Sequence, residues 1–320
     1  MAVHTKLSKK DILEILKKYN IGKLKKFSGI KEGIENTNYL IFTSKNKFIL
    51  TIFENRVNKS KIPIFLKLMT HCSNNKINCP NPIRDNNGNL INTVKVKKFG
   101  IFSFLNGKSK SKWDDDDCFF VGRTLANFHK KNINRNLNLK NNFGVSSWKK
   151  LLTKCKSQIN NIIPNCLGLM SSEIDFLNNE WPIDLPSGTI HGDLFPDNVL
   201  FSKKKISGIL DFYFSCDDIL VYDLAITLNA WGFRNGNFKK LLFSSVLQGY
   251  ETIRKLNKSE KRKLNILLRG ASMRFLLTRI YDMIYIDSSK FLNKKNPLEF
   301  FKILNFHRNI KNTTDYFSGI

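Results

Sequence analysis

The stretch from His191 to Asn198, HGDLFPDN in one-letter code, is followed by the pair Asp211-Phe212 and decides the fold. Four residues separate Asp193 from Asn198, and the second aspartate follows two short apolar runs. A carboxylate, an amide and another carboxylate in this order can position a hydroxyl and bind a divalent cation through oxygen. The stretch therefore predicts a catalytic site.

The spacing is that of the protein-kinase catalytic loop, in which an aspartate, four residues and an asparagine precede an Asp-Phe pair. We expect residues 199–202 and 206–210 to form a strand pair that leads to Asp211. In phosphoryl transfer one carboxylate takes the proton of the acceptor hydroxyl. The amide and the second carboxylate hold magnesium against the phosphates.

The alternative is a β-hairpin whose turns contain Asp and Asn only for local hydrogen bonding. However, five elements occur in the kinase order, and the last is the run YDLA at 222–225. This order favours the kinase interpretation. We expect His191 to brace the loop and not to accept the proton.

The chain of 320 residues has a net charge of +27, from 53 Lys and Arg against 26 Asp and Glu. Such a charge suits a nucleic-acid or anionic-membrane partner. The lysines are scattered, however, with no basic stripe interleaved with aromatics, so we expect neither partner. Between His191 and Asp223 the balance reverses to six aspartates against three lysines. Magnesium prefers such oxygen ligands.

The six cysteines form no Cys-x-x-Cys pair and no zinc spacing with the five histidines. This usage is typical of reduced thiols in an intracellular protein. The N-terminus lacks an apolar signal core, and no apolar run approaches transmembrane length. We therefore expect a soluble, cytoplasmic protein.

The N-terminal third is predicted to be rich in β-strands. Its first helix opens with a capping box, Ser8-x-x-Asp11. The expected elements in order are a helix at 8–20, strands at 23–30, 38–43 and 47–53, a helix at 62–72, a hairpin turn between two short strands at 85–88, and a last strand within 94–105.

Beyond residue 106 the pattern becomes helical. Four acids, Asp114 to Asp117, precede a periodic run, and we interpret them as a helix start because the helix dipole favours acids there. The expected helices are 119–129, 148–162, 171–179, 220–231, 239–256, 259–285 and 297–309. The sequence predicts an α+β, bilobed, protein-kinase-like fold. Its lobes would be a β-rich nucleotide-binding lobe, 1–104, and a mainly α-helical catalytic and substrate-binding lobe, 105–320.

The chain resembles the aminoglycoside-phosphotransferase-like kinases over nearly its whole length, and within them the homoserine kinase branch. The catalytic loop indicates the superfamily. The branch is indicated by YDLA at 222–225 with NAW at 229–231, and by RFLLTR at 274–279. Further matching stretches are 29–39, 47–54, 104–107 and 211–214.

The resemblance implies Mg-ATP-dependent phosphorylation of the side-chain hydroxyl of L-homoserine, giving O-phospho-L-homoserine for threonine synthesis. By motif match, Asp193 would be the catalytic base, and Asn198 and Asp211 would bind magnesium. Asp223 would support the catalytic loop through hydrogen bonds.

The nucleotide-binding half departs from the usual kinase pattern. Typical kinases place a lysine on the third strand and a glutamate on the next helix. Here Thr51 occupies the strand position, and the predicted helix contains no acid. Three residues are open as the source of positive charge: Lys47, Arg56 and Lys67.

The glycine-rich loop is also poor, since Gly33 alone lies in its predicted turn. We expect backbone N–H groups and the side chains of residues 36–38, including Asn38, to meet the phosphate oxygens. By the resemblance, backbone groups from Ser103 to Leu105 would hold adenine.

The superfamily motif alone leaves other acceptors open, namely choline, an aminoglycoside or a methylthioribose-like sugar. Choline requires an aromatic cage, for which residues 212–214, Trp231 and Phe233 are candidates, although core packing explains most of them. An aminoglycoside requires an acidic cleft, for which Asp217 and Asp218 are available. A nucleic-acid-binding protein on a degenerate kinase scaffold is disfavoured because the catalytic and metal positions occur in order.

Homoserine itself carries a carboxylate and an ammonium group, so its site needs a fixed cation and a fixed anion. The planar fork of an arginine suits the carboxylate. We expect Arg274 or Arg279 in this role, with an acid such as Asp217 or Asp282. The alternative for Arg279 is a surface ion pair with Asp282, three residues further along one helix.

Overall fold

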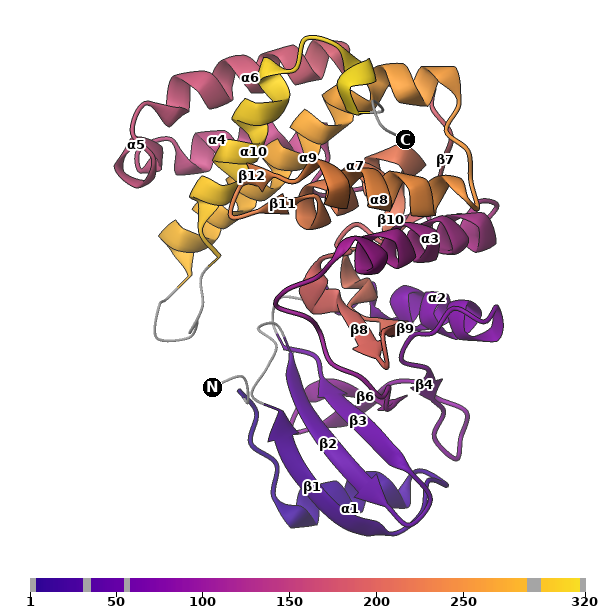
Figure 1. Ribbon diagram of the computed structural model, residues 1–320. Helices are drawn as coiled ribbons and strands as arrows, with labels where there is room; N and C mark the ends of the chain where they lie inside the picture. The colour runs from indigo at the N-terminus through magenta and orange to yellow at the C-terminus, as the bar shows by residue number, and fades with distance from the viewer. Residues whose placement is uncertain (1–3, 31–35, 55–57, 287–294, 317–320) are drawn as a thin grey trace. The chain divides into compact units, whose positions relative to one another are not determined.

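The computed structural model describes residues 4–30, 36–54, 58–286 and 295–316 (Figure 1). The chain forms two compact units: unit 1 comprises Met1–Gly107 and Ser207–Tyr213, and unit 2 comprises Lys108–Ile206 and Phe214–Ile320. Unit 1 therefore includes a segment far along the chain. Among the contacts of that segment, the Ile209 N–H donates to the main-chain oxygen of Asn78 at 2.9 Å, and the Tyr213 ring packs edge-on against Phe53 and Phe65.

Unit 1 is built on one antiparallel sheet in the order β1-β2-β3-β6-β4, with β5 also paired to β6. The strands are β1 (Leu24–Ile30), β2 (Thr37–Thr43), β3 (Lys47–Ile52), β4 (Pro82–Ile83), β5 (Asn92–Val94) and β6 (Lys97–Ser103), and the helices are α1 (Lys9–Lys17) and α2 (Ile62–Asn74). The predicted capping box of Ser8 and Asp11 begins α1. Apolar residues of α1 pack with buried residues of the sheet in one core, which includes Ile12, Leu50 and Ile101.

One local prediction is wrong. The turn at 85–88 was expected to join two paired strands, but β4 and β5 each pair with β6 and not with each other. The Asp85 carboxylate accepts the N–H groups of Asn87 at 2.9 Å and Asn89 at 2.7 Å. These bonds stabilise a wider loop, which connects β4 and β5 along the same edge of β6.

Unit 2 is mainly helical. Its helices are α3 (Asp115–Asn132), α4 (Val145–Cys155), α5 (Ile159–Ile162), α6 (Cys166–Glu180), α7 (Leu220–Trp231), α8 (Lys240–Glu251), α9 (Lys258–Tyr285) and α10 (Pro297–Asn309). Two short antiparallel pairs lie within it, β7 (Ser187–Ile190) with β10 (Cys216–Ile219) and β11 (Phe233–Arg234) with β12 (Asn237–Phe238). The expected hairpin is present as β8 (Val199–Ser202) and β9 (Lys205–Ile209). The predicted α+β class is confirmed.

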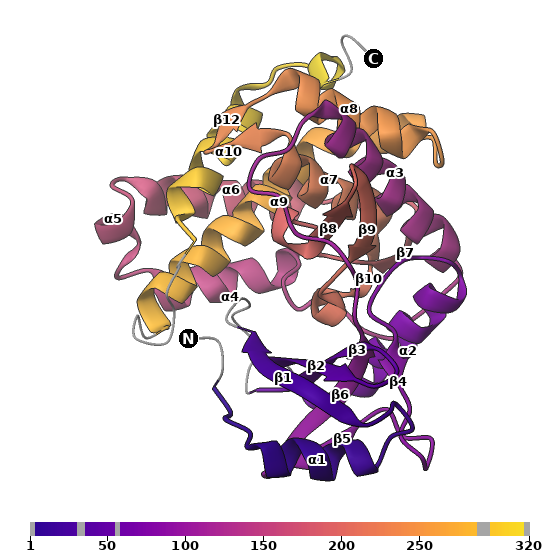
Figure 2. The same ribbon diagram turned by 60° about the horizontal axis from the view of Figure 1, so that its bottom comes forward.

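Helix α7 lies in the core of unit 2, where it packs against α3, α8 and α9, and its residues are almost all buried. The acids before α3 begin the helix as predicted, because Asp114 and Asp117 form a reciprocal capping box. Helices α3 and α8 lie side by side (Figure 2). A Cβ at Gly122 would lie 2.0 Å from the Val246 oxygen, and one at Gly249 would lie 1.9 Å from the Phe119 oxygen. Glycine is therefore required on both helices at this crossing.

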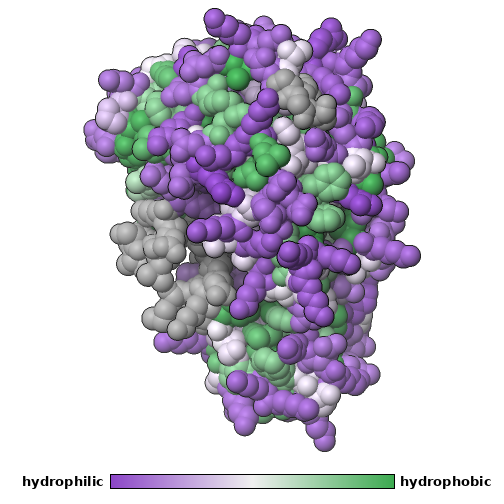
Figure 3. Space-filling view, viewed as in Figure 1, coloured by the Kyte–Doolittle hydropathy of each residue, from purple (hydrophilic) through white to green (hydrophobic). Residues whose placement is uncertain are grey.

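The face in Figure 3 is mostly hydrophilic, with hydrophobic residues in scattered patches. All six cysteines lie within the described residues and are free, buried thiols. Among the helices that the structure describes, none is long and apolar enough to cross a membrane.

Candidate active site

The catalytic loop of unit 2 brings Asp193 and Asn198 together. A 3-10 turn, η1 (Pro196–Asn198), ends the loop and leads into β8. Asn198 Nδ2 donates to the main-chain oxygen of Asp193 at 2.8 Å and to its carboxylate Oδ2 at 2.9 Å. Because the amide nitrogen faces Asp193, the amide oxygen points away from it. This oxygen accepts no hydrogen bond within the described residues and is available to a cation.

Asp223 on α7 holds the main chain of this loop. Its carboxylate oxygens accept the N–H groups of His191 at 2.7 Å and Gly192 at 2.8 Å. Burial raises the pKa of this carboxyl, but hydrogen bonds from His129 and His191 outweigh burial and hold the pKa below its ordinary value. Gly192 has a φ of 77°, and a Cβ there would lie 2.9 Å from the Phe214 oxygen. The loop therefore requires glycine at this position.

A chain of buried side chains continues from Asp223 to α3 and α8. His129 Nε2 lies 3.0 Å from the Asp223 carboxylate, and its Nδ1 lies 2.7 Å from the Tyr250 hydroxyl. An ionised carboxylate only accepts, so the Nε2 of His129 carries a proton and donates it to Asp223. Arg254 donates to the Tyr250 oxygen at 3.3 Å and to Glu260 at 2.6 Å. We call Asp223, His129 and Tyr250, which are fully buried, the support chain.

Two further contacts fix the loop. Asp193 N–H donates to His191 Nδ1 at 3.2 Å, and the His191 ring packs edge-on against Phe128. Trp231 Nε1 donates to the Leu194 oxygen at 2.8 Å. These contacts agree with the bracing role expected of His191.

Asp211, the predicted second magnesium ligand, belongs to unit 1. Its φ of 59° lies in the left-handed region, where a residue other than glycine is strained, and such strain is typical of functional positions. The Tyr213 N–H donates to Asp211 Oδ1 at 3.4 Å. Within the described residues no group of three or more His, Cys, Asp or Glu is placed to hold a metal. A carboxylate such as that of Asp211 still fits magnesium, which commonly takes its other ligands from phosphates and water.

The predicted phosphate-binding residues lie in unit 1. Asn38 on β2 is paired with Thr51 on β3, and the Thr51 hydroxyl donates to Asn38 Oδ1 at 2.8 Å. This bond leaves Asn38 Nδ2 without a partner among the described residues, so a donor is available to a phosphate. Gly33 lies outside the described residues.

The predicted adenine-binding segment follows the end of β6. Ser103 Oγ accepts the Asn81 N–H at 2.8 Å, which ties this strand end to the chain before β4. A Cβ at Gly208 would lie 2.5 Å from the Leu105 side chain. Glycine at 208 therefore makes room for Leu105 within unit 1.

The basic residue that takes the place of the usual strand lysine stays a prediction. Of the open candidates, Lys47 and Lys67 are exposed and Arg56 lies outside the described residues. Sequence reasoning missed Lys97 on β6, whose ammonium group pairs with the Glu54 carboxylate. The Thr37 hydroxyl donates to the same carboxylate at 2.7 Å. The only sign of this ion pair in the sequence is that Lys97 lies just before an apolar run.

The two predicted arginines of α9 are both buried. Arg274 is 3% exposed, and its guanidinium carbon lies 4.7 Å from the centre of the Phe275 ring and 5.3 Å from that of Phe143. Arg279 is 8% exposed, and its Nη1 donates to Glu299 on α10 at 2.6 Å. The ion pair of Arg279 is thus with another helix, and the surface pair considered from the sequence does not describe it.

The predicted acids occupy different environments. Asp217 accepts the N–H groups of Leu137 at 3.0 Å and Leu139 at 3.2 Å, so its carboxylate holds a neighbouring loop. Burial raises the pKa of Asp218, opposed by a hydrogen bond from Asn141. Asp282 is partly exposed near the end of α9.

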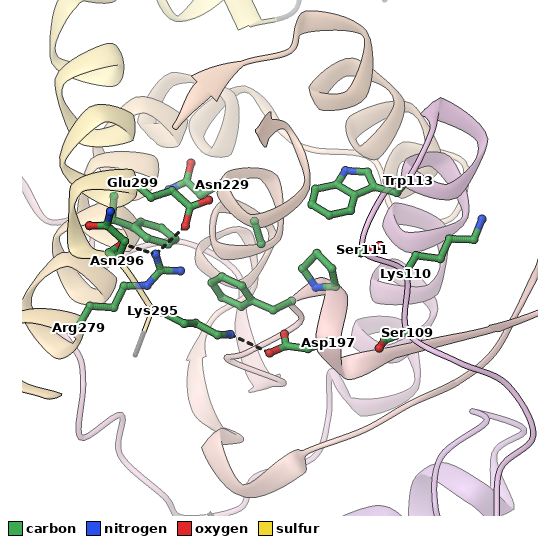
Figure 4. Close-up of a pocket in the computed structure, with 14 residues that line it drawn as sticks. Ser109, Lys110, Ser111, Trp113, Asp197, Asn229, Arg279, Lys295, Asn296 and Glu299 are labelled. Atoms are coloured by element: carbon green, nitrogen blue, oxygen red, sulfur yellow. Dashed lines mark hydrogen bonds and ion pairs between the residues drawn. The ribbon is translucent and has the colours of Figure 1, made fainter. Parts of the chain in front are cut away.

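A pocket of about 520 Å³ lies within unit 2 (Figure 4). Figure 4 shows Arg279, Asn296 and Glu299 on one side of it and Trp113 on the other. The residues that line it include Trp113, Phe195, Asp197, Arg279, Lys295 and Glu299. Of the four predicted substrate-binding residues, Arg279 is the one found in this lining, as far as the structure describes the chain.

The sequence profile of the phosphotransferase enzyme family matches residues 26–256. The chain belongs to this family. Within it, the chain is 39% identical over 317 residues to the homoserine kinase of Rhizobium johnstonii, with 99% of each chain covered. The homoserine kinase of Parvibaculum lavamentivorans is also 39% identical with 99% of each chain covered. The resemblance predicted from the sequence is confirmed.

A solved phosphotransferase structure has the same fold. Spectinomycin phosphotransferase in complex with ADP and spectinomycin superposes with a TM-score of 0.68 and 15% identity, covering 98% of this chain and 99% of that one. At this identity the likeness shows the fold alone. It confirms the phosphotransferase, kinase-like fold, with an N-terminal antiparallel sheet followed by a mostly helical part.

Two further residues, Glu299 of the pocket and His129 of the support chain, were not suggested by the sequence. Glu299 lies in the first turn of α10, where an acid normally reads as a helix-dipole partner. His129 ends a predicted helical run and reads as an ordinary amphipathic position. Their partners, Arg279 and Asp223, are distant in sequence, so no local pattern pointed to either pair.

Proposed function

We propose that the protein transfers the γ-phosphoryl group of ATP to the side-chain hydroxyl of L-homoserine, giving O-phospho-L-homoserine in threonine biosynthesis. The observation that carries this proposal is the full-length similarity to homoserine kinases, combined with a catalytic loop in which Asp193 and Asn198 are hydrogen-bonded at 2.9 Å. The side-chain hydroxyl distinguishes homoserine from amino acids without an acceptor oxygen.

In this reaction Asp193 acts on the acceptor. Its carboxylate accepts the hydroxyl proton as the homoserine oxygen bonds to the γ-phosphorus, while the bond from that phosphorus to the ADP oxygen breaks. Asn198 and Asp211 are the proposed magnesium ligands, through the amide oxygen and the carboxylate. Bound magnesium would neutralise charge on the phosphates. The support chain keeps the loop backbone fixed while Asp193 takes the proton.

The proposed nucleotide site belongs to unit 1. Gly33 and Asn38 are assigned to the phosphates, the first by its predicted turn and the second by its available Nδ2 donors. Backbone groups at Ser103 and Leu105 are assigned to adenine. Thr51 takes the place of the usual strand lysine and orients Asn38 through its hydroxyl.

The two charges of homoserine require an arginine and an acid of unit 2. Arg274 or Arg279 is proposed for the carboxylate, and an acid such as Asp217 or Asp282 for the ammonium group. An arginine fork binds a carboxylate bidentately, which gives both affinity and orientation.

The test is a substrate panel with purified protein, ATP and magnesium. The panel contains L-homoserine, choline, an aminoglycoside and methylthioribose, and ADP release is coupled to phosphorus NMR of the product. We expect phosphorylation of homoserine on its side-chain oxygen, at the highest kcat/KM of the panel. A higher kcat/KM with another alcohol, or no ADP release with homoserine, would reject the assignment.

A further inference from the structure

The pocket of unit 2 presents a cation and an anion that are fixed to each other. Arg279 Nη1 donates to Glu299 Oε2 at 2.6 Å and to the main-chain oxygen of Asn296 at 2.8 Å. The guanidinium also lies over Phe300, with its carbon 4.4 Å from the ring centre. A buried guanidinium that is stacked and anchored has little rotamer freedom left to lose on binding.

Two donor groups of Arg279 face no protein partner. Both hydrogen bonds use Nη1, and neither Nε nor Nη2 is bonded within the part of the chain that the structure describes. These two N–H groups form one edge of the planar fork, and that edge matches the two oxygens of a carboxylate. In Figure 4 the guanidinium extends from α9 toward the space surrounded by the labelled residues.

Glu299 supplies the complementary charge. Its Oε2 is engaged by Arg279, and its side chain is 37% exposed. Oε1 is bonded to none of the described residues, so it can accept from an ammonium group. An α-amino acid carries a carboxylate beside an ammonium group. Beside a neighbouring arginine and glutamate, the carboxylate of the amino acid can face the arginine while its ammonium group faces the glutamate.

The other charged pair of the pocket offers less fixed geometry. Lys295 Nζ lies 2.8 Å from Asp197, and their side chains are 47% and 57% exposed. Water screens such a pair, and an ammonium group lacks the planar fork of an arginine. Arg279 is therefore the better carboxylate receptor of this pocket.

The pocket shares a wall with the catalytic loop. Phe195 and Asp197 line it, and Phe195 follows Asp193 after one residue. Phe195 is itself fixed, because its ring packs edge-on against Phe275 at 4.7 Å between centres. The side chain of a ligand held by Arg279 can thus extend along the loop that carries the proposed base.

We propose that this pocket binds the zwitterionic head of the acceptor amino acid, with Arg279 on the carboxylate and Glu299 on the ammonium group. The assignment rests on the proposed homoserine kinase function and deepens it. It selects Arg279 over Arg274 and names an acid, Glu299, that the sequence did not suggest.

The experiment pairs two variants with substrates that lack one charge. Arg279→Gln and Glu299→Gln are assayed with homoserine, with aminopropanol, which is homoserine without its carboxylate, and with γ-hydroxybutyrate, which is homoserine without its ammonium group. KM is measured, or the inhibition constant against homoserine where an analogue is not turned over. Because a hydrogen bond to a charged group is lost, we expect Arg279→Gln to raise the KM for homoserine about 10- to 100-fold.

The analogues assign each charge. Arg279→Gln should change the constant for aminopropanol by less than about twofold, because the group that Arg279 binds is absent. Glu299→Gln should raise the KM for homoserine. It should change the KM or inhibition constant of γ-hydroxybutyrate by less than about twofold, because the ammonium group that Glu299 binds is absent. The KM for ATP should not change in either variant.

Arg308→Gln and Glu180→Gln are the matched controls, since both residues form ion pairs elsewhere in unit 2. Both controls should retain the wild-type KM for homoserine. Arg279→Lys, which keeps charge and bulk, replaces Arg279→Gln if the latter does not fold, and it should also raise the KM because the fork is lost.

An unchanged homoserine KM in the Arg279 variant overturns the inference, as does equal weakening of homoserine and aminopropanol. These results differ from failure of the proposed function, in which the wild-type protein itself does not phosphorylate homoserine.

Discussion

The two sides of the catalytic loop differ in how their polar side chains are partnered. The support chain of Asp223, His129 and Tyr250 is fully buried and bonded in series to the loop backbone. On the pocket side, Arg279 and Glu299 are paired through Nη1 and Oε2. The remaining donor nitrogens of Arg279 and the Oε1 of Glu299 are available to a ligand. A buried series of bonds fixes geometry, whereas an ion pair with unused donor and acceptor atoms can bind a ligand. Stability should therefore depend on the first side, and substrate affinity on the second.

Asp193→Ala has the largest expected effect. It tests the chemical step apart from the support chain and the Arg279–Glu299 pair. We expect kcat to fall about 10²- to 10⁴-fold, because the hydroxyl loses its proton acceptor. The melting temperature and the affinities for ATP and homoserine should stay close to wild type. Steady-state kinetics, calorimetry and titration measure these quantities, with the exposed Asp184→Ala as the control. Near-normal turnover in Asp193→Ala would contradict the assignment of the base.

Asp223→Ala tests the support chain directly. The substitution leaves two loop N–H groups and the proton of His129 without their acceptor in a fully buried site. Removing one partner of a buried charged group typically costs about 3–5 kcal/mol, which urea unfolding would measure as the free energy of unfolding. Glu299→Gln should cost less than Asp223→Ala in the same assay, because the glutamine keeps an oxygen that can accept from Arg279, which also donates to the Asn296 oxygen. Equal losses would break the distinction between the two sides.

The sequence predicted only some of these features. Interactions between residues close together in the chain leave a pattern in the sequence, and interactions between distant segments do not. Features set by neighbours in the chain were found: α7 and α10 have the predicted limits, and Asp114 begins α3. The catalytic spacing of Asp193 and Asn198 also lies within one loop. Such patterns are visible because the partners are a few residues apart.

Interactions between distant segments were not found. The pairing of β4 with β6 replaced a predicted hairpin because strand pairing depends on tertiary contacts. Glu299 meets Arg279 only because α10 packs on α9. The proposed catalytic base belongs to a local motif, whereas the proposed acceptor-binding pair joins two helices, so only the first has a pattern in the sequence.

A buried histidine behind the pocket makes stability depend on pH. Asn229 lines the pocket, and its Oδ1 lies 2.8 Å from Nε2 of the buried His307. Burial lowers the pKa of His307 from 6.5 to about 3. Between these values the unfolded chain binds a proton that the native state does not, so stability falls as the pH falls. The loss should approach about 1.4 kcal/mol per pH unit below 6.5.

The measurement is the free energy of unfolding from pH 7 to pH 4, for wild type and His307→Gln. The variant should be less stable at pH 7 but lose less stability on acidification, because its position does not titrate. His71→Gln, at a partly exposed histidine of unit 1, is the control and should keep the wild-type slope. Parallel wild-type and His307→Gln curves would show that His307 does not cause the acid sensitivity.

Lys295→Ala has the smallest expected effect and is the sharpest test of what makes the pocket specific. Lys295 and Asp197 form the pocket's exposed ion pair, at 2.8 Å, and exposed pairs contribute about 0–1 kcal/mol. We expect the KM for homoserine to change by less than about fivefold. The difference between variant and wild type should become smaller at high salt, because ions screen the charge. If the KM instead rises as much as in Arg279→Gln, total positive charge and not the oriented fork of Arg279 determines recognition. Buried geometry would then explain the stability of the loop but not the selectivity of the pocket.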